Sequence, residues 1–162
     1  LKQLEDFRID IAVTAERPAS DALLARKLRS DRLVAVVQRS SKLAKRKHLS
    51  FEQLVQLPVI LREEGSMTRR LLLDEVRRRG LRLHDTIEIE SREAAREAAA
   101  QGVGLAIMSE GELVPDGRLA SLLIDDWTSQ MEEWMLCLKS RAELHVIRSF
   151  FTLDDDKPGF KP

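Results

Sequence analysis

The stretch PVILREEGSMTRRLLLDEVRRRG, residues 58–80, predicts a strand followed directly by a helix. Its opening apolar run predicts a buried strand over 58–61. The pattern from 66 to 79 is helical, and Gly80 is placed to end that helix. Four apolar residues at helical spacing form its buried stripe: Met67, Leu71, Leu72 and Val76. Small hydroxyl side chains therefore stand where the strand gives way to the helix.

The following stretch, IEIESREAAREAAAQGVGLAIMSE at 87–110, repeats this arrangement. A strand is predicted over 86–90, and Ser91 stands where it would cap the next helix. That helix has an alanine face and ends at Gly102, and a further strand is predicted over 104–108. Strand, helix, strand, helix and strand in this order are typical of a parallel α/β sheet.

The flanking parts of the chain add less regular elements. Short apolar runs predict further strands over 9–15, 31–37, 119–124 and 134–139. Ser50 is predicted to cap a short helix that ends before Pro58, whereas 23–28 has no clear period. An amphipathic helix is predicted over 144–153, with buried Val146, Ile147, Phe150 and Phe151. The tail DDDKPGFKP, residues 154–162, is expected to be disordered.

Composition limits the classes of protein to which the chain can belong. Its 162 residues suffice for one domain, or for one domain made of two small lobes. The 27 basic residues balance 27 acidic ones, which argues against nucleic-acid binding by this segment. Cys137 is the only cysteine, so no internal disulfide can form and a reducing compartment is expected.

The ends of the chain and its hydropathy add two expectations. No run of about 18 apolar residues predicts a membrane span, and no secretory signal opens the chain. Residue 1 is leucine, so we expect the chain to be processed, trimmed or part of a longer protein.

Two hydroxyl-bearing helix starts are the candidate ligand site. Ser66 and Thr68 open one predicted helix, and Ser91 opens the next. The first N–H groups of a helix lack backbone partners, and the helix dipole favours an anion there. In a parallel sheet both starts lie at the carboxyl ends of strands, which is the edge where ligands bind. The alternative is plain capping, because serine and threonine are common at the helix starts of any α/β domain.

Other kinds of site have little support in the sequence. His48, His84 and His145 lack metal-ligand spacing, and one cysteine cannot complete a zinc site with them. No serine stands in a G-x-S-x-G elbow, and GVGLAI enters a strand instead of opening a helix as a dinucleotide motif does. Glu63 and Glu64 are adjacent at a strand end, where neighbouring side chains point to opposite faces. We therefore expect no enzyme activity, no metal and no cofactor.

The order of motifs resembles a known family. The segments are DIAV at 10–13, LVAVVQRSSKLA at 33–44, SFEQLVQLPVILREEGSMTR at 50–69, IEIESREAAREAAAQGVGLAIMSE at 87–110 and MEEWMLCLKSRAELHVIRSFFTL at 131–153. They resemble the effector-binding domain of LysR-type transcriptional regulators. The resemblance implies an α/β fold like that of type 2 periplasmic binding proteins, with two α/β lobes joined by crossing strands at 33–38 and 134–139.

The resemblance also implies a division into lobes and a set of site residues. Residues 1–38 and 136–162 would form part of regulatory lobe I, and residues 39–135 would form lobe II. A small anionic effector would bind in the cleft between the lobes. The residues matched to this ligand-binding site by position are Ser66, Met67, Thr68, Ser91 and Val103.

One part of the family pattern is missing from these 162 residues. In the family, a winged helix-turn-helix domain, a linker helix and the opening strands and helix of lobe I precede the DIAV strand. Lobe I is therefore expected to be incomplete, and DNA would be contacted only through the absent domain. The family pairs its effector domains antiparallel, so we expect a cytoplasmic homodimer or homotetramer without a membrane partner.

Two segments point to a subfamily. SREAAREAAAQGVGLAIMSEGEL at 91–113 and MEEWMLCL at 131–138 are similar to regulators associated with aminoethylphosphonate catabolism, which implies a phosphonate effector. The alternative function is a free-standing solute-binding protein of a transporter, which would share the fold and the anion site. An enzyme on the same fold would lack a convincing catalytic constellation here.

Overall fold

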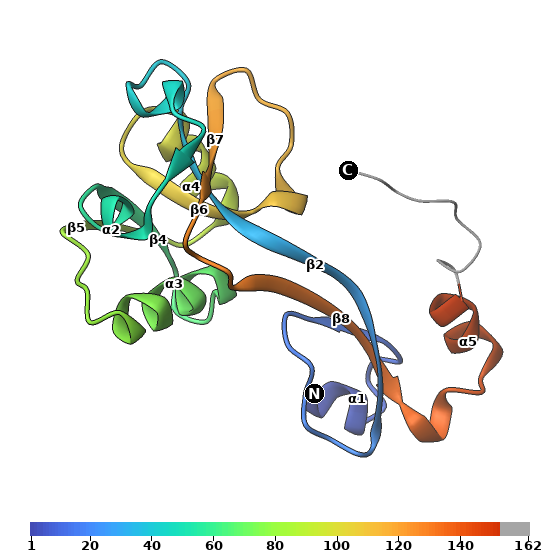
Figure 1. The fold of residues 1–162 in the computed structure, drawn as a ribbon. Helices are drawn as coiled ribbons and strands as arrows, with labels where there is room; N and C mark the ends of the chain where they lie inside the picture. The colour runs from blue at the N-terminus through green and yellow to red at the C-terminus, as the bar shows by residue number, and fades with distance from the viewer. Residues whose placement is uncertain (153–162) are drawn as a thin grey trace. The chain divides into compact units, whose positions relative to one another are not determined.

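The computed structural model describes residues 1–152, which divide into two compact units (Figure 1). Unit 1 comprises Leu1–Ser30 together with the chain from Glu132 onward, and unit 2 comprises Asp31–Met131. The tail at 154–162 and the last residue of the predicted C-terminal helix lie outside the described residues. The lobe boundaries implied by the family resemblance, after residues 38 and 135, stay a prediction.

Three parallel strands form the centre of unit 2. β4 (Pro58–Arg62) pairs with β5 (Asp85–Ile89) on one side and with β6 (Leu105–Ser109) on the other. These strands alternate with helices, as the pattern of residues 58–110 predicted. β5 is the last strand in this direction and is exposed along most of its length.

Antiparallel strands extend the sheet beyond β6. β2 (Leu23–Gln38) pairs with β6 and, on its other side, with β7 (Leu119–Ile124). The short strand β3 (His48–Leu49) runs parallel to the end of β7. Side chains alternate between the two faces of a strand, so the apolar run of β2 within unit 2 contributes to both faces of the sheet.

Helices cover the two faces of the unit 2 sheet. α2 (Phe51–Leu54) and α3 (Met67–Arg78) pack on the face that contains Leu33, Ala35 and Val37. α4 (Arg92–Ala100) packs on the face that contains Val34 and Val36. Its contacts there are made by alanines, which allow the helix to lie close to the strands. The helices predicted for this unit are thus all present, and Ser50 and Ser91 cap α2 and α4 as predicted.

A cluster of ion pairs around Glu75 closes the far end of α3. Glu75 is buried, and its carboxylate accepts hydrogen bonds from Arg78 and Arg79. The hydrogen bonds from Arg78 contribute most to lowering the pKa of Glu75, and Arg79 lowers it further. Burial alone would raise this pKa. Arg79 also pairs with Asp126, which in turn accepts the N–H of Phe51 at the start of α2. The cluster therefore joins both helices of this face.

β2 is far longer than the strand predicted over 31–37. It begins at Leu23, and its first half mixes half-buried and exposed side chains instead of forming one apolar run. Its partner in this half is β8 (Gln130–Leu138), and Lys27 and Arg29 pair with glutamates on that strand. Cross-strand ion pairs and backbone hydrogen bonds, rather than hydrophobic burial, hold this segment as a strand. The segment therefore lacks the apolar pattern from which a strand could have been predicted.

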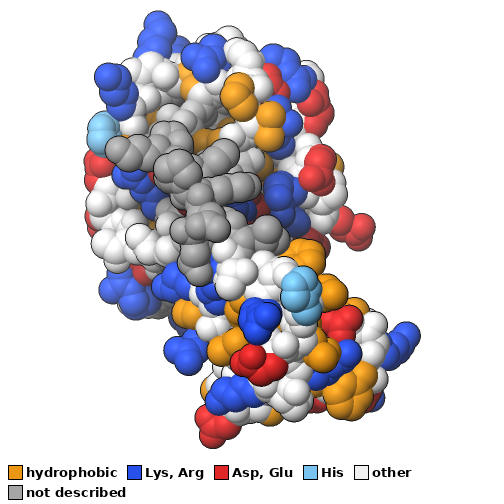
Figure 2. Space-filling model, turned by 90° about the vertical axis from the view of Figure 1, so that its right-hand side faces the viewer, with side chains coloured by type: hydrophobic (Ala, Val, Ile, Leu, Met, Phe, Trp, Pro, Cys, Tyr) orange, Lys and Arg blue, Asp and Glu red, His pale blue; other side chains and the backbone are white. Residues whose placement is uncertain are grey.

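Unit 1 has a small core. α1 (Lys2–Glu5) and the short strand β1 (Ala12–Thr14), which pairs antiparallel with β8, complete its described fold together with α5 (His145–Thr152). Among the described residues of the unit, its hydrophobic cluster contains three buried residues, Leu4, Leu23 and Leu136. Figure 2 shows hydrophobic side chains at the surface of this unit, in the lower part of the view, among charged ones.

Two predictions for unit 1 were wrong. The strand predicted over 9–15 has only three paired residues, and its Val13 is 59% exposed. In α5 only Ile147 of the four predicted core residues is buried, whereas Val146 is 67% and Phe150 51% exposed. The amphipathic pattern was correct, but the described part of the unit offers too little apolar surface to cover the helix.

Three 3₁₀ turns complete the elements: η1 (Leu43–Lys45), η2 (Glu110–Glu112) and η3 (Lys139–Arg141). Among the described residues, no helix combines the length and apolar character needed to span a bilayer.

Candidate functional site

The starts of α3 and α4 lie at the same edge of the unit 2 sheet. β4 and β5 are adjacent parallel strands, and Arg62 at the end of β4 pairs with Ile89 at the end of β5. Ser66 follows the first strand as the N-cap residue of α3, and Ser91 follows the second as the N-cap residue of α4. The structure therefore brings these two predicted site residues to the carboxyl edge of the sheet, where open α/β folds bind ligands.

The side chain of Ser66 does not cap its own helix. It makes no hydrogen bond with an N–H of the first turn of α3. Its Oγ lies instead 2.9 Å from Oγ1 of Thr68. Each hydroxyl can donate one hydrogen, so one O–H is used in this bond and the other stays available to an acceptor. The first turn also keeps N–H groups that Ser66 leaves uncapped, which favours an anion at this place.

Thr68 and Ser66 differ in their access to solvent. Thr68 is only 6% exposed, whereas Ser66 is half-buried. A ligand outside the helix start thus meets Ser66 first, and the buried Thr68 holds the serine hydroxyl in place. Met67, between them, is half-buried, and its Sδ accepts a hydrogen bond from Arg70 at 3.2 Å.

Ser91 behaves as an ordinary helix cap. Its Oγ accepts the backbone N–H of Ala94 at 3.0 Å, and the residue is exposed. Plain capping, the alternative left open by the sequence, therefore accounts for one role of Ser91. Its own hydroxyl hydrogen is still free to be donated, because capping uses only the oxygen as acceptor.

A cavity of about 320 Å³ adjoins the start of α3. Its lining includes Ser66, Met67, Arg69, Arg70 and Leu73. It therefore combines one hydroxyl and two guanidinium groups with an apolar wall, and Glu64 is the one carboxylate that borders it. Such a mixture suits a small anion better than a cation.

Ion pairs fix the strand ends beneath this cavity. Arg69 donates to the carbonyl oxygen of Arg62 at 2.8 Å and pairs with Glu88 of the neighbouring strand at 2.7 Å. Arg62 binds both carboxylate oxygens of Glu63 at 2.7 Å, and this contact lowers the pKa of Glu63. The negative charge nearest the turn is therefore paired, and Glu63 and Glu64 do not act as a carboxylate couple.

Val103 does not join the other predicted site residues. It precedes β6, and its N–H bonds to the carbonyl of Ala98 as α4 ends. The parallel register pairs Leu105 with Val59 near the start of β4, so Val103 stands at the amino ends of these strands. Ser66 and Ser91 follow the carboxyl ends. Within unit 2, Val103 thus belongs to the opposite edge.

Sequence reasoning overlooked a serine at the carboxyl edge. Ser109 ends β6, the strand on the other side of β4, and is fully buried. Its Oγ donates to the carboxylate of Asp31 at 3.3 Å. The same carboxylate lies so close to Gly111 that a Cβ there would meet it at 2.2 Å, and the aspartate side chain would have to move. A serine after a third parallel strand, like the serines after β4 and β5, was the signal that could have found it.

No group of histidine, cysteine or carboxylate side chains that could hold a metal ion is present among residues 1–152. Instead of a metal site, His48 forms a contact with one carboxylate: its Nδ1 lies 2.6 Å from an oxygen of Asp125.

Comparison with known families identifies the fold. Residues 1–153 match the family described as the LysR substrate binding domain. The chain belongs to this family. Its fold is therefore the type 2 periplasmic-binding-protein-like α/β fold that the motif order predicted.

The curated relatives of this LysR domain are transcriptional regulators. The HTH-type transcriptional activator CmpR of a Synechocystis species is 28% identical over 154 residues, which are 93% of this chain and 50% of the relative. A probable nitrogen assimilation transcriptional activator of Synechococcus elongatus is 28% identical over 117 residues, 70% of this chain and 38% of the relative. The chain thus spans half or less of the length of these relatives.

Solved structures agree on the fold. The CcmR regulatory domain of Synechocystis in complex with 2-PG superposes with a TM-score of 0.81 at 23% identity, covering 94% of this chain and 74% of that one. The BenM effector binding domain with its effector benzoate gives a TM-score of 0.77 at 15% identity, covering 98% and 76%. The finer assignment to aminoethylphosphonate-associated regulators stays a prediction.

Proposed function

We propose that this chain is the ligand-sensing part of a LysR-type transcriptional regulator. Family membership carries this proposal, and the regulators among its relatives support it. DNA contact is assigned to a helix-turn-helix domain outside these 162 residues, because the net charge of the chain is zero and phosphate binding needs a basic surface. A DNA-binding regulator works where the chromosome is, so we place it in the cytoplasm.

The proposed ligand is a small anion held at the start of α3. The observation that carries this assignment is the hydroxyl pair of Ser66 and Thr68, which leaves the first turn of α3 without a serine cap. Ser66 donates its O–H to the anion, Thr68 orients Ser66, and Met67 borders the ligand. Ser91 adds a second donor from the neighbouring helix start. Val103 is left out, because it stands at the opposite edge of the sheet.

Several contacts must act together to hold the anion, because the free energy of each one is small. One contact with a helix dipole contributes about 0.3–1 kcal/mol, and a hydrogen bond to a charged group about 1.5–3 kcal/mol. Two hydroxyl donors and the open first turn therefore suffice for binding in the micromolar to millimolar range. A phosphate or phosphonate offers three acceptor oxygens to these donors. The neighbour structure with 2-PG, which is 2-phosphoglycolate, supports that class of ligand.

Calorimetric titration with inorganic phosphate, 2-phosphoglycolate and aminoethylphosphonate tests the site. Removing the hydroxyls in the double variant Thr68→Val, Ser91→Ala should weaken the preferred anion about tenfold or more. Ser50→Ala is the matched control, because Ser50 caps α2 in a capping box and is not proposed to touch ligand. An unchanged affinity in the double variant overturns the site assignment.

The regulator assignment has a separate test. The coding sequence directly upstream of Leu1 should contain a helix-turn-helix pattern followed by the opening of the first lobe. A secretory signal in its place would make the chain part of a transport protein.

We also propose that two copies pair through the outer face of α3. Leu72 is buried and Leu71 packs against the same core, but Leu73 is only half-buried, and Ile87 on the edge strand β5 is 38% exposed. These residues form more apolar surface than the inner stripe of one helix needs. Light scattering after size exclusion should show a dimer or tetramer, and Leu73→Glu should give a monomer. A monomeric parent protein at micromolar concentrations contradicts the pairing.

A further inference from the structure

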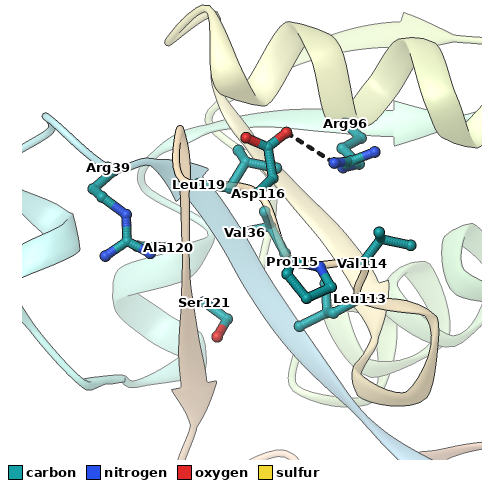
Figure 3. A pocket seen from close by; sticks show the side chains of 10 residues that line it. All are labelled: Val36, Arg39, Arg96, Leu113, Val114, Pro115, Asp116, Leu119, Ala120 and Ser121. Carbon is teal, nitrogen blue, oxygen red and sulfur yellow. Dashed lines mark hydrogen bonds and ion pairs between the residues drawn. The ribbon is translucent and has the colours of Figure 1, made fainter.

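A second cavity of about 260 Å³ lies in unit 2, on the face of the sheet covered by α4 (Figure 3). Its floor is apolar and belongs to the core of that face, with Val36 of β2, Leu119 of β7 and Leu113 of the loop between β6 and β7. Val114 and Pro115 of the same loop form a further apolar wall.

This cavity is separate from the start of α3. β2 runs antiparallel to β6, and its residue Leu33 pairs with Ser109 at the carboxyl end of β6. Val36 lies farther along β2, toward the amino end of β6, and Arg39 directly follows the strand. The α3 cavity, by contrast, follows the carboxyl end of β4, and no residue lines both cavities.

Two arginines border the cavity, and they differ in whether their guanidinium group is paired with a carboxylate. Figure 3 shows Arg39 and Arg96 at opposite ends of the lining residues. Arg96 donates to Asp116 at 2.8 Å, and Asp116 is bound by Arg118 as well. The guanidinium of Arg39 is exposed and has no ion pair or hydrogen bond within the described part of the chain. The one carboxylate of the lining is thus already neutralised, and one positive charge remains unpaired.

The lining offers two further donors. Ser121 presents an exposed hydroxyl from β7. The Nε–H of Arg96 is buried and meets no acceptor in residues 1–152. A buried donor without an acceptor is rare in folded proteins. Protein atoms bury that nitrogen. We therefore assign the primary contact with a ligand to the accessible guanidinium of Arg39.

From these observations we infer that the cavity binds a small organic monoanion with an apolar body. The carboxylate of the ligand pairs with Arg39 and reaches the hydroxyl of Ser121, and its apolar body lies on Val36 and Leu119. The volume equals roughly nine waters of about 30 Å³, which fits a ligand of about ten non-hydrogen atoms. A bare inorganic anion would leave the apolar floor uncovered and gain less. The chain would then respond to two different ligands.

Benzoate, benzamide and inorganic phosphate are suitable probes, because they separate the charge from the apolar body. Titrations followed by ¹⁵N–¹H spectra should show benzoate binding with shifts at Val36, Leu119 and Ser121. Benzamide, without the charge, should bind at least about fivefold more weakly, and phosphate should cause no shifts at these residues. Absence of benzoate binding at millimolar concentrations overturns the inference.

Substitutions of single arginines test whether the ligand contacts Arg39. Arg39→Gln should weaken benzoate at least about fivefold, and Arg39→Lys should recover part of the loss. Arg46→Gln is the matched control, because it removes the same exposed charge from unit 2 away from the cavity. Thr68→Val separates this inference from the proposed effector site. Equal affinity in Arg39→Gln and Arg46→Gln, or a loss of benzoate binding in Thr68→Val, overturns it.

Discussion

The hydroxyl oxygens of Ser66 and Thr68 lie 2.9 Å apart at the start of α3. A serine at this position usually bonds to the N–H two or three residues later, as Ser91 does with Ala94 at the start of α4. The two helix starts look alike in the sequence, yet they use their serines differently. At α3 the serine is turned to its neighbour, so the helix start is open to an external anion.

This difference predicts unequal costs for the same substitution. Ser91→Ala removes a cap hydrogen bond and should lower the free energy of unfolding by about 1 kcal/mol. Ser66→Ala removes no cap, and only its bond with the Thr68 hydroxyl is lost, so it should lower the free energy of unfolding by less than Ser91→Ala does. Urea denaturation of both variants checks the contrast. Equal losses would mean that Ser66 caps α3 in solution.

The α5 helix gives a second matched pair, in unit 1. Ile147 is buried, and Ile147→Ala should cost about 2–5 kcal/mol through lost burial and the cavity left behind. The preceding Val146 is 67% exposed, so Val146→Ala should change stability by less than about 0.5 kcal/mol. Thermal unfolding of the two variants tests this, and a similar loss for Val146→Ala would place that side chain in a contact surface.

The sequence predicted the regular parts of unit 2 and failed in unit 1 for a physical reason. The strands β4 and β6 are short apolar runs, and the helices α3 and α4 are followed by Gly80 and Gly102, which adopt positive φ. Such signals are local. The first half of β2 is a strand because β8 lies beside it, and Val146 is exposed because little apolar surface covers it. Neither fact is encoded in the period of the segment itself.

The placement of the candidate residues in the fold was predictable, but their contacts were not. The edge at which Ser66 and Ser91 meet follows from parallel strands, and the same rule would have removed Val103, which precedes its strand. The pairing of Ser66 with Thr68 depends on a side-chain rotamer that no sequence pattern fixes. Pairs of distant residues, such as Ser109 with Asp31, become visible only when the strands are in register.

The Asp116 cluster predicts a defined acid sensitivity. Hydrogen bonds from the side chain and backbone of Arg118 lower the pKa of Asp116 from its ordinary 3.8 to about 2 in the folded state. A carboxyl group with a depressed folded pKa contributes stability above its unfolded pKa, and loses it as the pH falls toward the folded pKa. The contribution should therefore be complete above about pH 4 and vanish between about pH 4 and pH 2.

Comparison of Asp116→Asn with the parent protein checks this window. The variant should unfold at a lower temperature at about pH 6, and the difference should shrink below about pH 4. Asp21→Asn is the control, because Asp21 is exposed and has no ion pair among the described residues. A difference that stays constant down to about pH 2 would show that Asp116 acts through something other than its charge.

Cys137 reports on unit 1, because it is fully buried in β8 and burial raises the pKa of its thiol. A thiol reagent attacks the thiolate, so the folded chain should react more than about a hundredfold more slowly than an exposed cysteine. The control is Ser140→Cys in a Cys137→Ser background, which places an exposed thiol three residues along. Equal labelling rates for the two would mean that β8 opens freely.

The same label can show which unit opens first. The cluster of unit 1 contains three buried residues, whereas the larger cluster of unit 2 surrounds the edge-to-face pair of Phe51 and Trp127, with ring centroids 5.2 Å apart. Less buried apolar surface means a lower free energy of opening. In Trp134→Phe, where Trp127 is the only tryptophan, Cys137 labelling should therefore accelerate at lower urea than the change in Trp127 fluorescence. Coincident transitions would show that the two units unfold as one.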